Sequence, residues 1–379
     1  MAKNQYKKEP LKNNVEEMFI GPFGSSLKNE CFVDEEDAYC MVYEQKHAIQ
    51  KTLDGKNRFV DKNKYYELKR FTIKPGDIIV SCRGTIGETF IVPKNAPLGI
   101  MHPSIMKIRL KPNVYNIEYF NLLLKNRLKD YNKSANGSGI KMAISATELG
   151  KEMFPIPPMD EQQKVSKIFL TVDRLIVLRQ QQLAKLDELV KARFVEMFGN
   201  PVSNPMGWKR VRFDSISENL DSKRVPVTES DRKDGVYPYY GASGIVDWIN
   251  DYIFDEDILL VSEDGANLLM RSTPIAFSVS GKSWVNNHAH VVRFHDFATQ
   301  KFIEVYFSLI DISEYITGTA QPKLNQAKLN TMLFCWPPLS LQKQFAAFVE
   351  RVDQQKQTVQ QSLEKLELMK KALMQEYFG

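Results

Sequence analysis

The sequence predicts an α+β protein in which two similar α/β domains are separated by two long α-helices that form an antiparallel coiled coil. Three observations lead to this prediction. A long segment that begins at Pro157 begins again at Pro337, 180 positions later, and the offset holds without a gap to the end of the chain. Neither copy has a proline or a glycine in its interior. The stretches before the two copies share one order of turns, strands and polar loops, so the repeat spans each half of the chain.

The repeated segment is predicted to form one long helix in each copy. The first copy begins PPMDEQQKV and ends EMFGN, and the second begins PPLSLQKQF and ends QEYFG. Proline suits the first turn of a helix and glycine suits its end. Each helix should therefore be about 55–60 Å long, at about 1.5 Å per residue.

Apolar residues recur along both copies with the spacing of a heptad seam. The seam is apolar toward its ends and mixed in its middle, around Arg179, Gln182, Gln355 and Ser362. Antiparallel pairing places the two mixed centres opposite each other, so we favour it over parallel pairing. The first helix carries a second apolar set, which widens its stripe beyond a two-helix seam. Either the globular domains or another protein would cover this wider stripe.

The first domain covers residues 1–156 and mixes basic loops with strands. Its turn-rich stretch GPFGSSLK ends at Lys28, which is a candidate phosphate contact, although a plain surface loop explains the stretch as well. The stretch Gln45 to Arg70 interleaves basic residues with aromatics, which suits a DNA-facing loop or a solvated charged face. The segment TIKPGDIIVSCRGTIGETFIV predicts two strands around a sharp loop that presents Arg83. A short helix over residues 117–131 and a Gly/Ser-rich loop follow.

The second domain covers residues 200–336 and follows the same order. Its strand-like DILLVSEDGA takes the place of GDIIVSCRGT in the first domain, and GKSWVNNHAHVVRF comes next. A helix over residues 300–311 and the polar loop TGTAQPKLN then lead to an apolar strand before the second Pro-Pro. Two matched scaffolds with different loops fit two related tasks performed on different targets.

Composition narrows the class of protein. The chain has 379 residues, with 51 lysines and arginines against 46 aspartates and glutamates, and a net charge of +5. This mild basic excess is compatible with nucleic-acid binding without proving it. We find no apolar run long enough for a membrane span and no signal peptide. The four cysteines lack metal or disulfide spacing, so we expect reduced thiols in a cytoplasmic protein.

The sequence lacks the motifs of the common enzyme classes. It has no Walker-type phosphate loop, no GxGxxG after a strand, no NPPY or DPPY tetrapeptide and no HExxH site. His288 and His290, two positions apart on a predicted strand, would point the same way as a pair of metal ligands. No further ligand completes the set, so no metal is predicted. The acidic run Asp255, Glu256, Asp257 lacks the nearby lysine of a nuclease site, and no catalytic residue is predicted.

A set of motifs in a fixed order resembles one known family. The motifs are GPFGSSLK, GDIIVSCRGTIG, PIPPMDEQQK, YPYYGASGI, EDGANLL, GKSWVNNHAH, TAQPKLN and WPPLSLQKQ. Together they resemble, over the whole chain, the specificity subunit of type I restriction-modification systems. The resemblance implies two target recognition domains, 1–156 and 200–336, that each read one half of a split DNA sequence. It also implies two helical spacers, 157–199 and 337–379.

The resemblance further implies partners and the absence of catalysis in this chain. Two modification subunits, which bind S-adenosylmethionine and methylate adenine, are expected on the helices, and restriction subunits join them. No cofactor is expected in this chain itself. The second helix begins with Ser340, Leu341 and Gln342 where the family has DEQ, so the two helix starts differ as docking places. Two alternatives stay open: an enzyme such as a nuclease with an unrecognised site, and a scaffold that binds only protein.

Candidate contact residues follow from these assignments. Side chains that reach base edges are expected to specify the sequence, and lysines on phosphates are expected to position the protein. The base-reading candidates are Lys46, Arg58, Arg83, Asn286, Asn287, His288 and Arg293. The phosphate candidates are Lys28, Lys141, Lys282 and Lys323. The partner-binding candidates on the helices are Gln162, Leu183, Val190, Phe194, Gln342 and Leu363.

Overall fold

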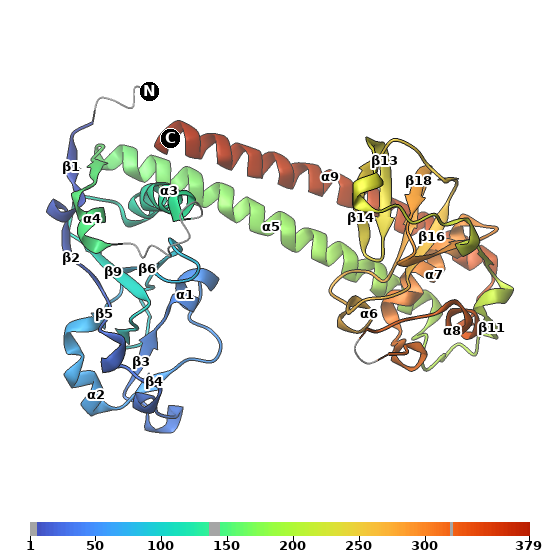
Figure 1. The fold of residues 1–379 in the computed structure, drawn as a ribbon, viewed down its shortest axis with the longest axis horizontal. Coiled ribbons are helices and arrows are strands. Elements are labelled where there is room, and N and C mark those ends of the chain that lie inside the picture. The colour runs from blue at the N-terminus through green and yellow to red at the C-terminus, as the bar shows by residue number, and fades with distance from the viewer. Residues whose placement is uncertain (1–5, 136–144, 319–320) are drawn as a thin grey trace. The chain divides into compact units, whose positions relative to one another are not determined.

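The computed structural model of the chain describes residues 6–135, 145–318 and 321–379. The chain separates into two compact units, whose elements are labelled in Figure 1. The first unit consists of Met1–Val177 and Lys365–Gly379, and the second of Leu178–Glu364. Each unit therefore contains one globular domain together with part of each long helix.

The first unit is built on a four-stranded antiparallel sheet in the order β2-β9-β6-β7. Its strands are β2 (Val15–Ile20), β6 (Ile78–Ser81), β7 (Thr89–Ile91) and β9 (Ile105–Leu110). A second sheet has the order β4-β3-β8-β5, and its central strands β3 and β8 are parallel. These strands are β3 (Cys40–Tyr43), β4 (Phe59–Val60), β5 (Thr72–Ile73) and β8 (Gly99–Met101). A further pair joins β1 (Lys8–Pro10) to β10 (Met153–Pro155).

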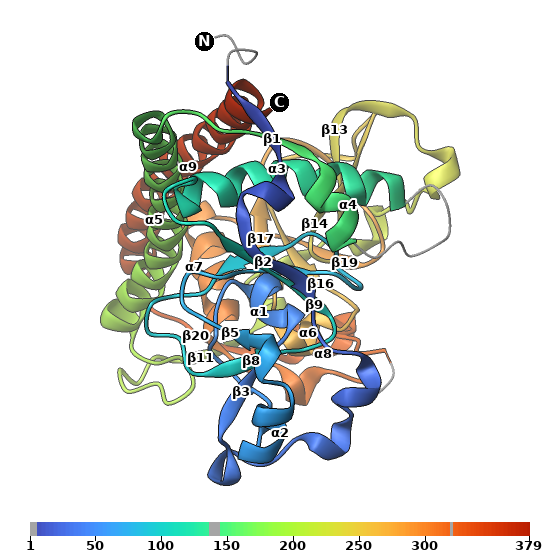
Figure 2. The same ribbon diagram turned by 90° about the vertical axis from the view of Figure 1, so that its left-hand side faces the viewer.

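The central sheet of the first unit is covered on both faces. Alternation along β6 sends Ile78 and Val80 into one hydrophobic core and Ile79 into another. The first core includes α3 (Ile117–Ala135), which lies over the strands of this sheet in Figure 2, and the second core includes the second sheet. All four residues of β6 are buried, which confirms the buried strand predicted from its continuous apolar run.

The basic stretch of the first domain contains two short helices that the sequence analysis did not predict. They are α1 (Gln45–Gln50) and α2 (Lys62–Glu67). The carboxylate of Asp61 accepts a hydrogen bond of 2.7 Å from the backbone N–H of Lys64 and so caps α2. A third short helix, α4 (Ala146–Lys151), precedes β10.

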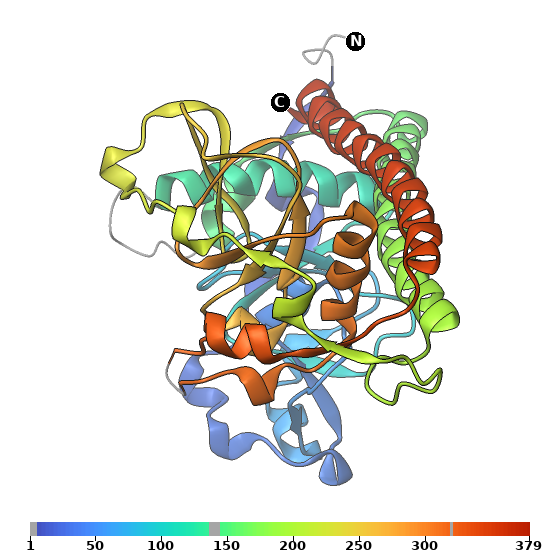
Figure 3. The same ribbon diagram turned by 90° about the vertical axis from the view of Figure 1, so that its right-hand side faces the viewer.

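The second unit repeats this arrangement (Figure 3). Its central sheet has the order β12-β19-β16-β17, with β12 (Glu218–Asn219), β16 (Ile258–Ser262), β17 (Ala276–Val279) and β19 (Ala289–Arg293). Its second sheet has the order β14-β13-β18-β15, with β13 (Asp234–Gly241), β14 (Gly244–Ile249), β15 (Phe254–Asp255) and β18 (Lys282–Val285). The last pair is β11 (Arg210–Arg212) with β20 (Leu333–Cys335). Its short helices are α6 (Asn267–Met270), α7 (Phe297–Leu309) and α8 (Gln326–Thr331).

The strand orders of the two units match strand for strand. In each four-stranded sheet, the strand at a given place in the second unit has a number ten higher than its counterpart in the first unit. The strands β3 and β8 are parallel in the first unit, as are β13 and β18 in the second. The prediction of two similar domains is therefore confirmed, and the repeat includes the globular parts as well as the helices.

The two long helices are α5 (Met159–Phe198) and α9 (Leu339–Phe378), each 40 residues long, as predicted. Gly199, which follows α5, has a positive φ of 77°, the conformation for which glycine is favoured at a helix end. None of the helices formed by the described residues combines the length and apolar character that crossing a bilayer requires.

Within each unit, the parts of α5 and α9 run in opposite directions. In the first unit, the rings of Phe169 and Phe378 lie 5.8 Å apart, and Asp173 forms an ion pair of 2.6 Å with Lys370. In the second unit, Asp187 pairs with Lys356 at 2.5 Å. There too, the rings of Phe194 and Phe345 lie 5.4 Å apart, and the Nε of Arg179 donates to the Oγ of Ser362 at 3.3 Å. The predicted antiparallel direction and the meeting of polar groups near Arg179 are both present.

Candidate nucleic-acid interface

In both units, two loops leave the central sheet at the same edge. In the first unit, the backbone N–H of Cys82 donates to the carbonyl oxygen of Ser104 at 2.9 Å. In the second unit, the N–H of Glu263 donates to the carbonyl oxygen of His288 at the same distance. These bonds make Cys82 the counterpart of Glu263, and Ser104 the counterpart of His288. We call this edge the reading edge; it consists of residues 82–88 and 102–104 in the first unit and residues 263–275 and 286–288 in the second.

The reading edge of the first unit contains one predicted base-reading residue, Arg83, and two others, Lys46 and Arg58, lie next to it. Glu44, directly after β3, pairs with Lys46 at 3.2 Å and with Arg58 at 3.4 Å. Arg83 is exposed and makes no ion pair with the described residues. Burial lowers the pKa of His102; the carboxylate of Glu44 raises it by less, and the charges of Arg58 and Arg83 lower it further. Arg83 thus leaves a positive charge at this edge that no carboxylate of the described residues pairs with.

A turn of the same shape precedes β9 and β19. In the first unit, the Nδ1 of His102 accepts from the backbone N–H of Ser104 at 3.2 Å. In the second unit, the Oδ1 of Asn286 accepts from the N–H of His288 at 2.8 Å. Asn286 is only 7% exposed, so it shapes the turn and does not face outward as its predicted base-reading role would require. The neighbouring Asn287 and His288 are exposed.

The reading edge of the second unit pairs acids with bases. The Nδ1 of His288 lies 2.9 Å from a carboxylate oxygen of Asp264, and the imidazole side chain is 49% exposed. Lys323, predicted as a phosphate contact, forms an ion pair of 3.1 Å with Glu263. The structure therefore brings together Asn287, His288 and Lys323, and supplies each of the last two with a carboxylate that the sequence analysis did not assign.

Beneath this edge lies a group of charged residues that we call the acid–base cluster. Arg224 donates to Glu263 at 2.7 Å and lies 3.4 Å from Asp221. The Nδ1 of His290 is 2.6 Å from Asp221, and its Nε2 is 2.7 Å from the carbonyl oxygen of Leu324. Both ring nitrogens of His290 therefore face oxygen atoms. The cluster consists of Asp221, Arg224, Glu263, His290 and Lys323.

The carboxylates of the cluster are held in their charged form. For Asp221, burial raises the pKa, but the hydrogen bond and charge of His290 and the N–H of Val291 lower it by more, so the pKa is below its ordinary value. For Glu263, burial again raises the pKa, and Arg224 with His290 and Lys323 brings it below its ordinary value. Opposite charges and donors thus outweigh desolvation at both sites.

The cluster does not fit a metal site. One ligand atom from each of Asp221, Glu263 and His290 lies within 4.8 Å of the others. Arg224 already lies against both carboxylates, and both nitrogens of His290 are in use. His288 and His290 also do not face one site, because His288 is exposed beside Asp264 while His290 is 1% exposed. The two histidines therefore do not point to one shared place as their spacing suggested.

Arg293 lies at the far end of β19 from the reading edge. Its guanidinium pairs with Glu218 at 2.7 Å and with Glu256 at 3.0 Å. In the first unit, Arg109 takes the same place on β9 and pairs with Glu17 at 2.9 Å. The two arginines thus join the same pair of strands in both units. This placement differs from the predicted base-reading role, because carboxylates neutralise the donors that a base edge would need.

The remaining phosphate candidates lie apart from the reading edge. Lys28 is exposed, with its Nζ 3.8 Å from Glu30. Lys282 is exposed at the start of β18, with its Nζ 4.6 Å from the ring centre of Tyr252. Lys141 lies outside the described residues. The ion pair of Lys28 with Glu30 is long and exposed, and Lys282 has no ion pair among the described residues, so both lysines can contact a phosphate.

The two glutamines predicted to bind a partner are buried inside their own units. Gln162 is 1% exposed and accepts from the N–H of Asn116 at 2.8 Å. Gln342 is fully buried and accepts from the hydroxyl of Thr299 at 2.8 Å. Their amide nitrogens donate to the carbonyl oxygens of Pro157 and Pro337. Both side chains thus fasten a helix start to its domain, and neither is available to a partner in this structure.

The other helix candidates divide between core and surface. Phe194 is fully buried and stacks on Phe302 with ring centres 5.1 Å apart, and Leu363 is 8% exposed. Leu183 is half-buried and borders a shallow hollow between α5 and α9, within the second unit. Val190 lines a larger cavity. Of these candidates, Leu183 is the one that borders an accessible surface, whereas Val190 is buried and lines the wall of a cavity.

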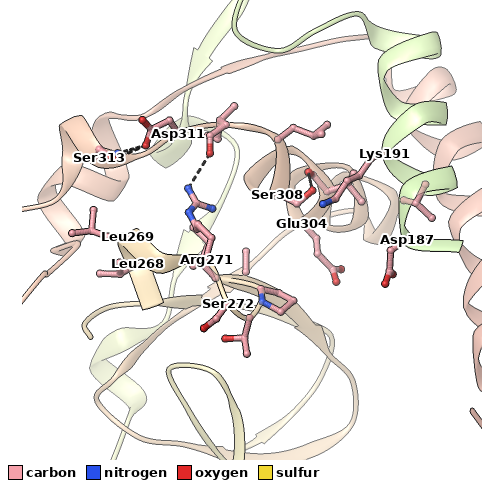
Figure 4. Close-up of a pocket in the computed structure, with 18 of the residues that line it drawn as sticks. Asp187, Lys191, Leu268, Leu269, Arg271, Ser272, Glu304, Ser308, Asp311 and Ser313 are labelled. Carbon is pink, nitrogen blue, oxygen red and sulfur yellow. Dashed lines mark hydrogen bonds between the residues drawn. The ribbon is translucent and has the colours of Figure 1, made fainter. Parts of the chain in front are cut away.

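The larger cavity belongs to the second unit and has a volume of about 750 Å³. Figure 4 shows Arg271 between the leucines of α6 on one side and Asp187 and Lys191 of α5 on the other. The guanidinium of Arg271 donates to the carbonyl oxygen of Ile310 at 2.9 Å, and burial lowers its pKa below the ordinary value. Polar and apolar side chains both line the cavity. The apolar lining residues are Val190, Leu268, Leu269, Ile275, Ala276, Val305, Leu309 and Ile310.

Comparison with known proteins gives one consistent family. A family model described as "Type I restriction modification DNA specificity domain" matches residues 35–188 and 205–368. The Haemophilus influenzae protein S.HindORF215P, described as a type I restriction enzyme specificity subunit, is 32% identical over 143 residues, which cover 38% of this chain and 36% of that protein. The MjaVIII type I specificity subunit of Methanocaldococcus jannaschii is 23% identical over 81% of this chain and 79% of that one.

Solved structures share the fold. The crystal structure of a type I restriction-modification S subunit from M. genitalium matches all of this chain and 98% of that one, with a TM-score of 0.58 and 14% identity. A chain from a structure of the type I R-M system, whose title concerns complex assembly and conformational transition, matches with a TM-score of 0.57 and 13% identity. At these identities the likeness concerns the fold alone.

Proposed function

The chain belongs to the type I restriction-modification DNA specificity family, and we propose that its two domains each read one half of a bipartite DNA target. The observation that carries this proposal is the repeated reading edge. The same two loops leave the same edge of the same sheet in both units, but they present different side chains. A duplicated scaffold with divergent loops suits two half-sites of different sequence.

The side chains at the two edges suit contacts with DNA. Lys46 and Arg58 share the single carboxylate of Glu44, so together with Arg83 they leave a net positive charge that would attract phosphates. A guanidinium that reaches the major groove matches the O6 and N7 acceptors of guanine. In the second unit, Asn287 and His288 are exposed beside charged groups that are already paired. Because these charges are already paired, less of the binding free energy would come from nonspecific attraction to phosphates. More of it would come from hydrogen bonds to bases.

We further propose that α5 and α9 set the gap between the half-sites and dock two modification subunits. Each helix contributes to both units, because the division between them falls at Val177 and Leu178 in α5 and at Glu364 and Lys365 in α9. The cavity beside Val190 and the hollow beside Leu183 give a partner apolar surface on the helices. In this proposal the modification subunits supply S-adenosylmethionine and the methylation of adenine.

This division of labour makes the chain a recognition subunit without catalysis of its own. The complex would also include restriction subunits, and it would work in the cytoplasm, where cellular DNA is and where thiols stay reduced. All four cysteines of the chain are unpaired, in keeping with that compartment. The rival proposals are a nuclease and a scaffold that binds only protein.

The test is to map methylated sites in cells that carry the complete system. We expect one bipartite sequence with an unread gap, lost when this chain is deleted and present when the restriction subunit is deleted. Insertion of four residues beside Gln182 in α5 should lengthen the gap or abolish recognition. Cleavage of DNA by the purified chain with Mg²⁺ would favour the nuclease, and methylation that ignores sequence would favour the scaffold.

A further inference from the structure

The interior just below the reading edge is apolar in the first unit. Ile20 pairs with Met106 across β2 and β9, and Val80 pairs with Met106 across β6 and β9. Cys82, the first residue after β6, lies beside them. Cys82 and Met106 are at most 1% exposed, and Ile20 packs against the same hydrophobic core. Three uncharged side chains thus fill this part of the first unit.

The same three positions are ionic in the second unit. Glu218 pairs with Arg293 across β12 and β19 just as Glu17 pairs with Arg109 across β2 and β9. Three residues further along these strand pairs, toward the reading edge, Asp221 is the counterpart of Ile20 and His290 is the counterpart of Met106. Glu263 takes the position of Cys82, as their shared backbone hydrogen bond shows. The scaffold therefore accommodates either an apolar set or a charged set at this place.

A charged set in this place has a cost that an apolar set lacks. Buried charges lose hydration and contribute to stability only if every one of them is paired, so apolar residues of similar size often stabilise a fold at least as well. The first unit demonstrates that the fold does not need the charges. Their presence in the second unit requires another explanation.

The explanation lies in what the cluster connects. Asp221 and Arg224 come from the segment after β12, Glu263 follows β16, His290 is on β19, and Lys323 is on the loop before α8. Lys323 and Arg224 both bind Glu263, and Glu263 is the chain neighbour of Asp264. The carboxylate of Asp264 in turn accepts from the Nδ1 of His288. The cluster thus joins four distant segments directly behind the exposed imidazole.

We propose that the acid–base cluster positions the Asp264–His288 pair, and that His288 determines specificity in the second half-site. This inference rests on the proposed function. Where the N–H of His288 is on Nδ1 and donates to Asp264, the Nε2 of the ring is left as an acceptor. An acceptor suits the exocyclic amino group of adenine or cytosine. Arg83 stands at the position of Asp264 in the first unit and, as a donor, suits guanine.

The test uses the full chain together with the modification subunit of its own system, and a panel of DNA duplexes with each base pair of both half-sites changed in turn. We expect His288→Ala to lose discrimination at one base pair of the second half-site, by about 5-fold to 100-fold, and to leave the first half-site unchanged. The base at that position in the cognate site should be adenine or cytosine on one strand. The matched control, Arg83→Ala, should lose discrimination at a guanine of the first half-site only.

The positioning role is tested by giving the second unit the interior of the first. The quadruple variant Asp221→Ile, Arg224→Gln, Glu263→Cys, His290→Met, in which Arg224 is replaced because both of its carboxylate partners are removed, should keep its circular dichroism spectrum and its first half-site discrimination, yet lose second half-site discrimination as His288→Ala does. Asp264→Asn provides a second variant that leaves the cluster intact and should give a partial loss at the same base pair.

Two outcomes would overturn the inference while the proposed function stands. One is that the wild type recognises a bipartite target and His288→Ala discriminates the second half-site as well as the wild type does. The other is a folded quadruple variant that discriminates as the wild type does. Failure of the proposed function looks different, because the wild-type complex would then show no sequence preference in either half-site.

Discussion

The two units share their strand order and differ in the chemistry of one edge. In the first unit, Arg83 lies above an apolar interior, and the basic residues near it remain at least partly exposed to solvent. The second presents His288 over the acid–base cluster, in which each charge meets an opposite one. Topology therefore fixes where the loops leave the sheet, and a few side chains at equivalent positions decide what the loops bind. Changes made at equivalent positions can test that view.

The largest expected effect is the loss of an aromatic side chain that only the second unit has. Phe194 is fully buried against Phe198, Phe302 and Phe345, so Phe194→Ala should lower the free energy of unfolding by about 3–5 kcal/mol. Its counterpart 180 residues later, Met374, is partly buried, and Met374→Ala should cost less than about 2 kcal/mol.

Tryptophan fluorescence during urea unfolding measures this difference. The four tryptophans, Trp208, Trp248, Trp284 and Trp336, all belong to the second unit, so their emission reports on that unit. Circular dichroism follows both units together. Equal shifts of the fluorescence midpoint in Phe194→Ala and Met374→Ala would contradict the assignment of these residues to separate cores.

The next effect concerns two carboxylates that pair with equivalent arginines of the two units from different positions and are buried to different extents. Asp77 is 1% exposed and binds Arg109 through two hydrogen bonds of 2.7 Å. Asp77→Ala leaves that guanidinium without its buried partner and should cost about 3 kcal/mol. Glu256 is 29% exposed beside Arg293, and Glu256→Ala should cost at most about 1 kcal/mol. Urea unfolding followed by circular dichroism checks the ranking, and an equal cost would count against burial as the cause.

A smaller effect is expected from acid. The pKa of Asp221 in the folded chain is below its ordinary value of 3.8, so its contribution to stability is present above pH 3.8 and is lost as the pH falls through the lower folded value. The fluorescence midpoint of the second unit in urea should therefore decrease as the pH falls below 3.8. Asp221→Asn should make that decrease shallower. Parallel curves for the variant and the wild type would refute the role of this carboxylate.

The smallest effects are expected from the lysines proposed to contact DNA phosphates. Lys28→Ala and Lys282→Ala should each weaken DNA binding to all sequences alike and reduce the slope of log affinity against log salt by about 1. Lys323→Ala is the matched control, because Glu263 already neutralises that lysine and the slope should change little. Binding isotherms of the complex at four salt concentrations measure the slopes. A larger slope change for Lys323 than for Lys28 would reverse the assignment.

Some features of this protein follow from local sequence alone. The two long helices begin after Pro-Pro, end at glycine and lack helix breakers between, and the structure has them at the predicted offset. The apolar run Ile78 to Val80 predicted a buried strand, and the loop after it presents Arg83 as expected. These features depend on neighbours within a few turns of the chain, so periodicity and turn residues determine them.

Other features were decided only by tertiary structure. Arg293 was predicted to read bases because it is basic, but Glu218, which neutralises it, is 75 positions away in the chain. Asn286 was predicted to face DNA, but it is buried in its turn. His290 meets Asp221 across 69 positions, and Lys323 meets Glu263 from a separate loop. No local sequence pattern encodes such pairs. A charged residue looks the same in the sequence whether its side chain is hydrated or paired with a distant residue. Only the packing of strands and loops determines which of the two applies.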